Sequence, residues 1–368
     1  MFPEDYLYIL ALRQCKNIGI ANLKKLIRHL GSARSVWEIS KKELLSISGI
    51  GTITIADIGK KEFILSAEKE LTFCENHKIK IIDQQNEFYP KYLLNCEDSP
   101  ILLFYKGNLN PQLNPLSVVG TRNLTSYGKN FIQDLMKNLM GNNIVSISGL
   151  ALGADSCVHE ESLKNQIPTI AVLAQSLNTI YPSVNKKLSE KILENDGALI
   201  TEYANFDGSS KEYFLQRNRI IAGFSPNLIV AETAFGGGSV TTVNYANQYN
   251  REVFALPGKI TDKYSQGCNL LISLNKAESI VDVKTLIKHL NYQSPELFPK
   301  KVTKIKLSED KKEHQLILDI IGKNKITSLD EIAEKSDILH HKLLPILLDL
   351  EIYGYVKCLS GKQYQLES

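Results

Sequence analysis

The sequence lacks the short motifs that mark several large classes of enzyme. It contains no GxxxxGK(S/T) phosphate-binding loop, no HExxH metal-binding pair, no GxSxG nucleophile elbow and no strict GxGxxG dinucleotide fingerprint. These absences argue against a P-loop nucleotide hydrolase, a zinc protease, an α/β-hydrolase and an ordinary NAD-dependent enzyme. We therefore expect no catalytic residue, no metal ion and no cofactor.

Cysteine pairs and long apolar runs are also missing. The six cysteines are scattered with no CxxC pair, unlike a zinc ribbon or a thioredoxin-type motif. No run of 18 apolar residues occurs, and Glu4 and Asp5 precede the short apolar stretch at the N-terminus, where a signal peptide carries basic residues. We expect reduced thiols, a cytoplasmic location and no membrane anchor.

Net charge does not single out a partner. Among 368 residues, 43 Lys and Arg oppose 40 Asp and Glu, which gives a formal charge of only +3 at pH 7. Any surface for nucleic acid must then be a local patch. The length fits two or three domains, and a composition of 43% hydrophobic and 23% charged residues is typical of folded proteins.

Residues 1–78 predict a small all-helical domain of the helix-hairpin-helix, or SAM-like, kind. Apolar residues recur every three or four positions, as in Leu23, Leu26 and Leu30. Two glycine turns, residues 17–20 (NIGI) and 47–51 (ISGIG), lie next to helical stretches. Glycines in such turns either let backbone amides approach a DNA phosphate or only cap the helices.

From about 79 to 285, short β-branched runs alternate with amphipathic segments of helix length. This alternation predicts an α/β domain with a parallel sheet and crossover helices. Ligands bind at the carboxyl ends of the strands in such sheets. The clearest expected strands are residues 116–119, 144–147, 169–173, 198–201, 228–231 and 253–256.

The remainder of the chain predicts a linker, residues 286–313, and a winged-helix domain, residues 314–368. The linker contains two prolines and a basic cluster, Lys300, Lys301, Lys304 and Lys306, with little apolar periodicity. Three helical segments then precede two short strand segments, with a turn expected at Ser360 and Gly361. This order of elements is that of a winged helix.

Loops rich in glycine and hydroxyl residues follow three of the expected strands. Such loops offer backbone amides and hydroxyl groups to an anion, and the Arg122 guanidinium adds a bidentate phosphate donor. One loop of this kind is common in proteins, but three at one sheet edge predict an anion site. The candidate ligand-binding residues in these loops are Gly120, Thr121, Arg122, Ser148, Gly149, Gly237, Gly238 and Ser239.

Two arginines flank Asn218 at the expected start of a helix. Cations oppose the dipole at a helix N-terminus, so Arg217 and Arg219 need an outside anion or an internal carboxylate. Asp155 and Glu202 are possible internal partners. We expect one arginine to be structural and the other to contact the ligand.

His159 lies one helical turn after Asp155 and is interpreted as a structural histidine satisfied by a neighbour.

Seven ordered motifs across residues 80 to 285 resemble the DNA-processing protein A family (DprA, also called Smf). The motifs are SVVGTRNLTSYG (117–128), SGLALGADSCVHEESL (148–163), TIAVLAQSLNTIYPSVNKKL (169–188), FLQRNRIIAGFS (214–225), GGGSVTTVNYA (236–246), REVFALPG (251–258) and SQGCNLLI (265–272).

The resemblance implies an extended Rossmann-like domain between the helical domain and the winged helix. It also implies a non-catalytic single-stranded DNA-binding protein that forms homodimers and loads RecA during natural transformation, with single-strand binding protein as a further possible partner. DNA would contact Arg217, Asn218 and Arg219 in the RNR motif, together with Lys186 and Lys187, in addition to the loop residues above. The sequence leaves open which arginine and which lysine make the contact.

Two positions depart from the family pattern. The family's LGTGLD corresponds to residues 173–178 (LAQSLN), which changes the loop after that strand, and Leu215 replaces the proline of an FP pair. The aromatic residues Tyr181 and Phe214 are candidates for stacking on bases.

Two other functions compete with this interpretation. Phosphoribohydrolases of the LOG type resemble the fold, but their GGxGTxxE glutamate corresponds here to Thr241 or Thr242, so the nucleotide-cleaving reading loses its catalytic acid. A winged-helix transcription factor is disfavoured because the C-terminal segment is a small share of the chain and its third helix is rich in leucine.

Overall fold

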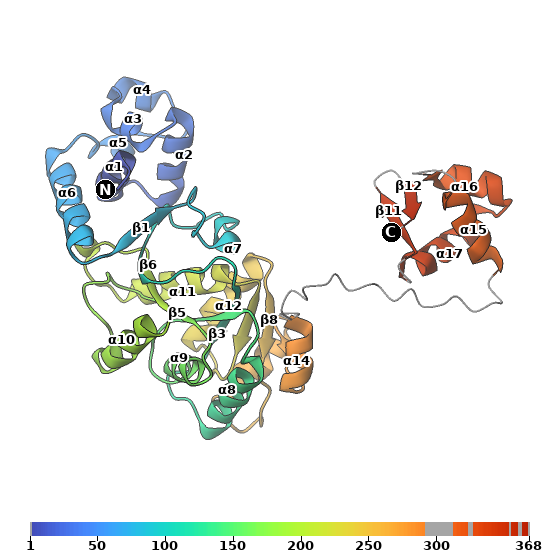
Figure 1. The fold of residues 1–368 in the computed structure, drawn as a ribbon. Coiled ribbons are helices and arrows are strands. Elements are labelled where there is room, and N and C mark those ends of the chain that lie inside the picture. Colours follow the sequence, from blue (N-terminus) through green and yellow to red (C-terminus); the bar gives the residue numbers. More distant parts are fainter. Residues whose placement is uncertain (1, 291–311, 323–326, 353–354, 360–362, 367–368) are drawn as a thin grey trace. The chain divides into compact units, whose positions relative to one another are not determined.

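The computed structural model describes residues 2–290, 312–322, 327–352, 355–359 and 363–366, within two compact units that comprise residues 1–293 and 294–368 (Figure 1). The first unit contains the N-terminal helices and a nine-stranded sheet, and the second contains three helices and a three-stranded sheet. Within these ranges, every helix is too short or too polar to cross a membrane.

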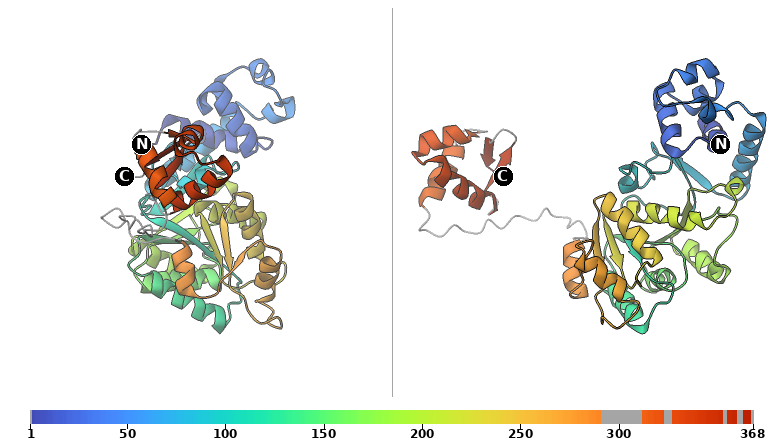
Figure 2. Two further views of the ribbon diagram at one scale, coloured as in Figure 1. Left: turned by 90° about the vertical axis from the view of Figure 1, so that its right-hand side faces the viewer. Right: turned by 180° about the vertical axis from the view of Figure 1, so that it is seen from behind.

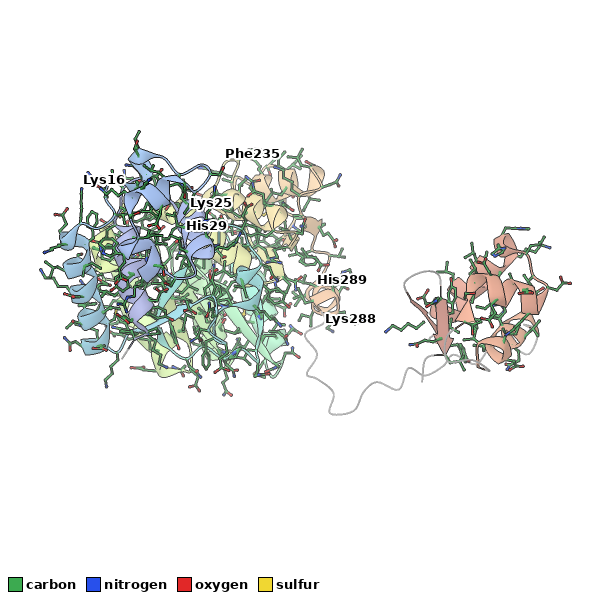
Figure 3. The ribbon with its side chains drawn as sticks, turned by 90° about the horizontal axis from the view of Figure 1, so that it is seen from above. Lys16, Lys25, His29, Phe235, Lys288 and His289 are labelled. Atoms are coloured by element: carbon green, nitrogen blue, oxygen red, sulfur yellow. The ribbon has the colours of Figure 1, made fainter. Side chains whose placement is uncertain are left out.

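The N-terminal part is helical, as the sequence predicts. The first glycine turn contacts the helix that follows the second one, because the Asn17 side chain donates a hydrogen bond of 3.2 Å to the Ile53 carbonyl. Gly49 has a φ of 74°, which allows the tight turn before α5. Lys16 and Lys25 lie on this part (Figure 3). The helices are α1 (Glu4–Arg13), α2 (Ile20–Leu30), α3 (Ala33–Glu38), α4 (Lys41–Leu45), α5 (Thr52–Ile55) and α6 (Lys61–Asn76).

The large sheet has the strand order β1-β2-β6-β5-β4-β3-β7-β8-β9. All six expected strands are present as β3 to β8 and pair in parallel. β1 and β2 add an antiparallel edge. The α/β prediction is thus confirmed. The strands are β1 (Lys80–Asp83), β2 (Leu102–Gly107), β3 (Asn114–Val119), β4 (Ile144–Ser148), β5 (Thr169–Val172), β6 (Ala198–Thr201), β7 (Asn227–Val230), β8 (Glu252–Ala255) and β9 (Glu278–Ser279).

Helices cover both faces of this sheet. Apolar side chains of α8, α9 and α14 pack against Leu116 and Val118 of β3 on one face. Side chains of α11, α12 and α13 pack against Ile147 of β4 and Val230 of β7 on the other face. Figure 2 shows α14 (orange) beside α8 (green). The bounds are α7 (Lys91–Leu94), α8 (Ser126–Leu139), α9 (Ala154–Lys164), α10 (Lys186–Glu194), α11 (Glu212–Phe224), α12 (Gly238–Gln248), α13 (Gln266–Ser273) and α14 (Val283–Leu290).

The strand order reverses at β3, which pairs with β4 on one side and with β7 on the other. Ligands bind at such a switch point in doubly wound sheets, because the loops after the two strands diverge there. The end of the first unit differs from the prediction: α14 continues to Leu290, past the expected linker start at residue 286. Leu286 and Leu290 are buried in the core, so their apolar contacts extend the ordered chain.

The second unit has the order of elements expected of a winged helix. Its core includes Ile321, Leu343, Leu347 and Val356. The expected turn at Ser360 and Gly361 lies outside the described residues. The elements are α15 (Lys312–Gly322), β10 (Thr327–Ser328), α16 (Leu329–Ser336), α17 (His340–Ile352), β11 (Val356–Leu359) and β12 (Gln363–Leu366).

Candidate nucleic-acid interface

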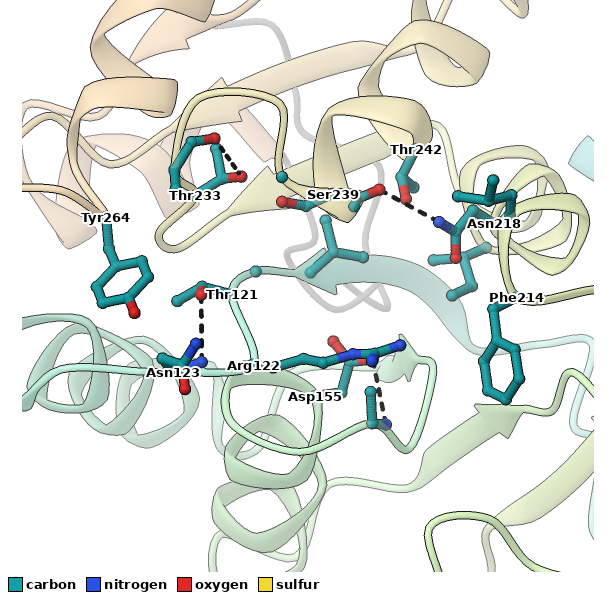
Figure 4. A pocket seen from close by; sticks show the side chains of 18 of the residues that line it. Thr121, Arg122, Asn123, Asp155, Phe214, Asn218, Thr233, Ser239, Thr242 and Tyr264 are labelled. Carbon is teal, nitrogen blue, oxygen red and sulfur yellow. Dashed lines mark hydrogen bonds between the residues drawn. The ribbon is translucent and has the colours of Figure 1, made fainter. Parts of the chain in front are cut away.

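Loops at the carboxyl edge of the large sheet surround a cavity of about 500 Å³. The loop after β3 and the start of α12 face each other across it, and α11 contributes Asn218 and Phe214 (Figure 4). This volume lies within the roughly 300–1,000 Å³ of small-ligand sites. The lining residues are 119–123, Ala151, Asp155, Phe214, Leu215, Arg217, Asn218, Ile221, Thr233, Ala234, Gly237, Gly238, Ser239, Thr242, Lys263 and Tyr264.

Backbone hydrogen bonds hold the loop after β3 in place. The Thr121 amide donates to the Glu232 carbonyl at 2.7 Å, and the Thr121 carbonyl accepts from the Ala154 amide at 3.0 Å. A Cβ on Gly120 would lie 2.6 Å from the Ala154 Cβ, so only glycine fits there. The buried Glu232 carboxylate accepts from the Thr125 amide and hydroxyl at 2.8 and 2.6 Å and anchors the start of α8.

Arg122 leaves this rigid loop with its side chain exposed. Its guanidinium lies 6.0 Å from the centre of the Phe214 ring, which lies 5.5 Å from the Tyr181 ring in an edge-to-face arrangement. Among the described residues, no carboxylate forms an ion pair with Arg122. A guanidinium without an ion-pair partner in the described part of the chain therefore lies beside Phe214 and Tyr181, the two aromatic residues that the sequence suggested for base stacking.

A second, smaller cavity lies beside the first. The two cavities share the lining residues Arg122, Ala151, Phe214 and Arg217 and are therefore adjacent; together they are called the depression below. Its further lining residues are Gly149, Leu152, Ala174, Gln175, Tyr181 and Pro182. Ala174 and Gln175 belong to the segment that departs from the family pattern, and they form part of this wall.

Arg217 is not at a helix start, which corrects the prediction. α11 begins at Glu212, whose amide donates to the Ser210 hydroxyl at 3.3 Å, so Arg217 lies in the second turn. Its guanidinium is buried and donates to the carbonyls of Gly149, at 2.5 Å, and Val172. Arg217 thus forms the floor shared by both cavities, and the dipole argument does not apply to it.

Arg219 points into the protein. It is 6% exposed, forms an ion pair with Glu202 and donates to the Asp98 carbonyl at 2.7 Å. Burial raises the pKa of the Glu202 carboxyl, and the charge of Arg219 opposes that rise. Of the two arginines, Arg219 is therefore the one with the structural role, and Glu202 is its ion-pair partner. The contact of Arg219 with DNA stays a prediction.

Ser148 is buried and holds two strands together, and its contact with DNA stays a prediction. Its side chain is fully buried, and its hydroxyl donates to the Val118 carbonyl at 2.8 Å, which joins β4 to β3. Gly149, a candidate for ligand binding, packs against the Arg217 side chain. A Cβ there would lie 2.6 Å from the Arg217 guanidinium, so this glycine makes room for the arginine at the cavity floor.

Asn218 and the start of α12 line the cavity as expected. The Asn218 amide donates to the Gly238 carbonyl at 3.3 Å and connects α11 to α12. Open space surrounds the Cα of Gly238, whereas a Cβ on Gly237 would lie 2.5 Å from the Thr233 hydroxyl oxygen. Ser239 is 7% exposed, and its hydroxyl has no hydrogen-bond partner among the described residues.

Lys186 and Lys187 are exposed in the first turn of α10, and neither lines the two cavities. The preceding residue Asn185 donates to the Leu150 carbonyl at 2.8 Å, which fixes the start of α10 against the loop after β4. The two lysines therefore lie at the carboxyl edge of the sheet, outside the depression. Their contact with DNA stays a prediction.

Asp155, which lines the main cavity, and His159 are both buried titratable groups. Burial raises the pKa of the Asp155 carboxyl, while the charge of Arg217 acts in the opposite direction. His159 accepts or donates a hydrogen bond of 2.7 Å with the Thr169 hydroxyl through Nδ1, and burial lowers its pKa to about 3. The structural interpretation of His159 is confirmed. Among the described residues, no cluster of His, Cys, Asp and Glu is arranged to hold a metal ion.

Sequence reasoning missed several lining residues. Lys263 and Tyr264 come from the segment between β8 and α13. Tyr264 reaches the site because its carbonyl accepts from the Thr233 amide at 2.7 Å. No local pattern signals this long-range pairing. Phe235 is 59% exposed on the loop between β7 and α12 (Figure 3).

Comparison with known proteins identifies related sequences. The model of the DNA recombination-mediator protein A family matches residues 80–291, and the model of the DprA winged helix domain matches residues 305–362. Protein Smf of Escherichia coli is 32% identical over 307 residues, which cover 82% of this chain and 81% of that protein.

Solved structures agree with this relationship. The X-ray structure of DNA processing protein A from Streptococcus pneumoniae superposes with a TM-score of 0.66 and 30% identity, covering 78% of this chain and 98% of that one. A structure that concerns the single-stranded DNA binding mode of DNA processing protein A from Helicobacter pylori gives a TM-score of 0.52 and 28% identity, covering 58% and 95%. The chain therefore belongs to the DNA recombination-mediator protein A family.

Proposed function

We propose that this DNA recombination mediator binds single-stranded DNA, without catalysis, in the depression at the carboxyl edge of the large sheet. The observation that carries the proposal is the exposed Arg122 guanidinium, which has no carboxylate partner among the described residues and lies 6.0 Å from the Phe214 ring. A cation beside aromatic rings suits a phosphate and its neighbouring base. The single-stranded DNA binding of the Helicobacter pylori relative supports the proposal.

The shape of the depression favours a single strand over a duplex. A cavity of about 500 Å³ can take in one nucleotide at a time. A flexible strand can turn a nucleotide into it, whereas a stiff duplex keeps its bases stacked and paired. Arg122 and Asn218 would contact phosphates at the rim, and Arg217 would add positive charge from below.

We propose that the protein is not an enzyme. Asp155 is the one carboxylate that lines the main cavity among the described residues, and it lies against the positive charge of Arg217. A phosphoribohydrolase needs a free acid near the sugar, and Thr242 lines the wall where that acid would stand. The nucleotide-cleaving alternative therefore lacks its central residue.

The biological role follows from family membership. We propose that the protein loads RecA onto incoming DNA in the cytoplasm during natural transformation and helps RecA displace single-strand binding protein. Because the sequence has no P-loop, RecA alone would consume ATP. Leu270 of α13 and Leu274, which directly follows this helix, are 42% and 55% exposed, and we propose α13 and its C-terminal end as part of a homodimer surface.

A binding titration tests the main proposal. A fluorescein-labelled dT20 strand and a blunt duplex of equal length are titrated with the full chain in moderate salt, with EDTA present and no nucleotide added. We expect tighter binding to the single strand, since the contacts need neither metal nor ATP. Equal or tighter binding to the duplex would contradict the proposed site.

A further inference from the structure

The wall of the main cavity at the start of α12 carries a polar group without a partner. Ser239 is 7% exposed and lines the cavity (Figure 4), yet its hydroxyl makes no hydrogen bond within the described part of the chain. A buried hydroxyl without a partner costs free energy unless a ligand or water pairs with it. Ser239 belongs to the first turn of an 11-residue helix whose N-cap, Gly237, offers no side-chain hydrogen bond.

This end of the cavity suits an anion. The amides in the first turn of a helix lack intrahelical partners and present positive charge. Gly238 has no neighbouring heavy atom within 4 Å of where a Cβ would stand, so the backbone is open to a ligand. The charged residues that line the cavity are Arg122, Arg217, Lys263 and Asp155, which leaves an excess of positive charge.

The wall behind this end is closed. A Cβ on Gly237 would lie 2.5 Å from the Thr233 hydroxyl oxygen, and one on Gly267 would lie 2.5 Å from the carbonyl oxygens of Thr233 and Ala234. The Gly267 amide donates to the Thr233 carbonyl at 2.9 Å. A DNA strand therefore cannot continue between the start of α12 and α13. It can leave toward the second cavity, which shares the lining residues Arg122, Ala151, Phe214 and Arg217 with the main cavity.

We propose that this end of the cavity binds a terminal phosphomonoester of a nucleotide. A bridging phosphodiester needs a path for the chain on both sides, whereas a terminal phosphate needs a path on one side only. A terminal phosphate also carries a charge of about −1.5 to −2 at pH 7 and three acceptor oxygens, which match the Ser239 hydroxyl and the first amides of α12. The inference rests on the proposed function, because the rest of the strand would lie along Arg122 and Phe214.

The ligand can come from the phosphorylated end of a strand or from a free mononucleotide, and two experiments separate these sources. In the first, the full chain is titrated with dT20 that carries a phosphate or a hydroxyl at the 5′ end and fluorescein at the 3′ end, and with the reverse pair. We expect one phosphorylated end to bind about fivefold to tenfold tighter, which at tenfold equals about 1.4 kcal/mol. In the second, calorimetry compares dTMP with thymidine.

Variants connect the effect to Ser239. Ser239→Ala should narrow the affinity difference between phosphorylated and unphosphorylated ligands. Ser279→Ala, at an exposed serine on β9, should leave this difference unchanged, and thermal melting checks that both variants fold. Binding of dTMP but not thymidine, with no effect of strand ends, would assign the site to free nucleotides. Binding of dTMP without binding of any strand would refute the proposed function and keep this inference. Equal affinities for all phosphorylated and unphosphorylated ligands would overturn it.

Discussion

Arg217 and Arg219 lie two residues apart in α11 and have opposite surroundings. Arg217 faces the cavity floor, where two backbone carbonyls accept from it, and Arg219 faces Glu202 in the interior. Side chains two positions apart project from different sides of a helix, which explains the division. The sequence predicted that the two roles differ, but it could not assign them, because both partners come from distant strands.

Removal of the Arg219 guanidinium should lower the free energy of unfolding. Arg219→Ala leaves the Glu202 carboxylate buried without its counter-charge, and breaking such a pair costs roughly 3–5 kcal/mol. Urea denaturation of the variant should show a loss of this size, whereas Lys137→Ala, an exposed lysine on α8, should be neutral. Unchanged stability together with weaker DNA binding would show instead that Arg219 contacts the ligand.

His159 should make stability depend on pH. Burial lowers the pKa of His159 to about 3 in the folded state, and an exposed histidine in the unfolded chain has a pKa of about 6.5. As pH falls below about 6.5, the unfolded chain binds a proton that the folded chain refuses, so stability falls by about 1.4 kcal/mol per pH unit. Denaturation of the wild type and of His159→Asn between pH 7 and 4 should give a steeper loss for the wild type. Parallel curves would mean that His159 takes up its proton without unfolding.

At the scale of elements, the α13 helix should mediate self-association. Leu270 and Leu274 are exposed apolar side chains one turn apart. Leu270→Glu with Leu274→Glu adds two charges to this surface and should convert a dimer into a monomer in sedimentation velocity. Leu94→Glu serves as the control, because Leu94 is a 44% exposed leucine at the end of α7. A wild-type chain that is monomeric at all concentrations would exclude the homodimer.

The parallel core was predictable, and its edges were not. Strands β3 to β8 are short apolar runs buried on both faces, which gives a strong local signal. β1 and β9 lie at the edges of the sheet and are only partly buried or exposed, so they lack the continuous buried apolar run that marks the central strands. Arg217 and Arg219 suggested that α11 begins beside them. The Ser210 hydroxyl instead accepts from the Glu212 amide, so the helix begins more than one turn earlier.

At the scale of the whole molecule, long-range contacts decide what sequence reasoning misses. Arg13 of α1 forms an ion pair of 2.9 Å with Asp207, and Glu70 of α6 accepts from the Asn205 amide at 3.1 Å. These contacts join the N-terminal helices to the segment after β6. A pairing across more than a hundred residues leaves no mark in local periodicity, so the sequence predicted both parts but not their connection.

The winged-helix unit should be dispensable for binding a single strand. Both cavities are lined by residues of the first unit, and we propose that the C-terminal unit is an accessory module. A chain that ends after Leu290 keeps α14 and its buried contacts, so it should fold and bind dT20 with an affinity within about threefold of the full chain. A folded truncation that no longer binds would place the main site in the C-terminal unit.

Arg122 carries the central claim, and its removal is the most direct test. Arg122→Ala deletes an exposed guanidinium, so we expect weaker binding to dT20 by about 1.5–3 kcal/mol, the range for a charge-assisted hydrogen bond. The slope of log affinity against log salt should fall by about 0.7, the contribution of one phosphate contact on a single strand. The melting temperature of Arg122→Ala should stay nearly unchanged. Lys137→Ala on α8 should alter neither the affinity for dT20 nor the salt slope. If Arg122→Ala binds dT20 as the wild type does but melts much lower, Arg122 is a structural residue and the account of the site is wrong.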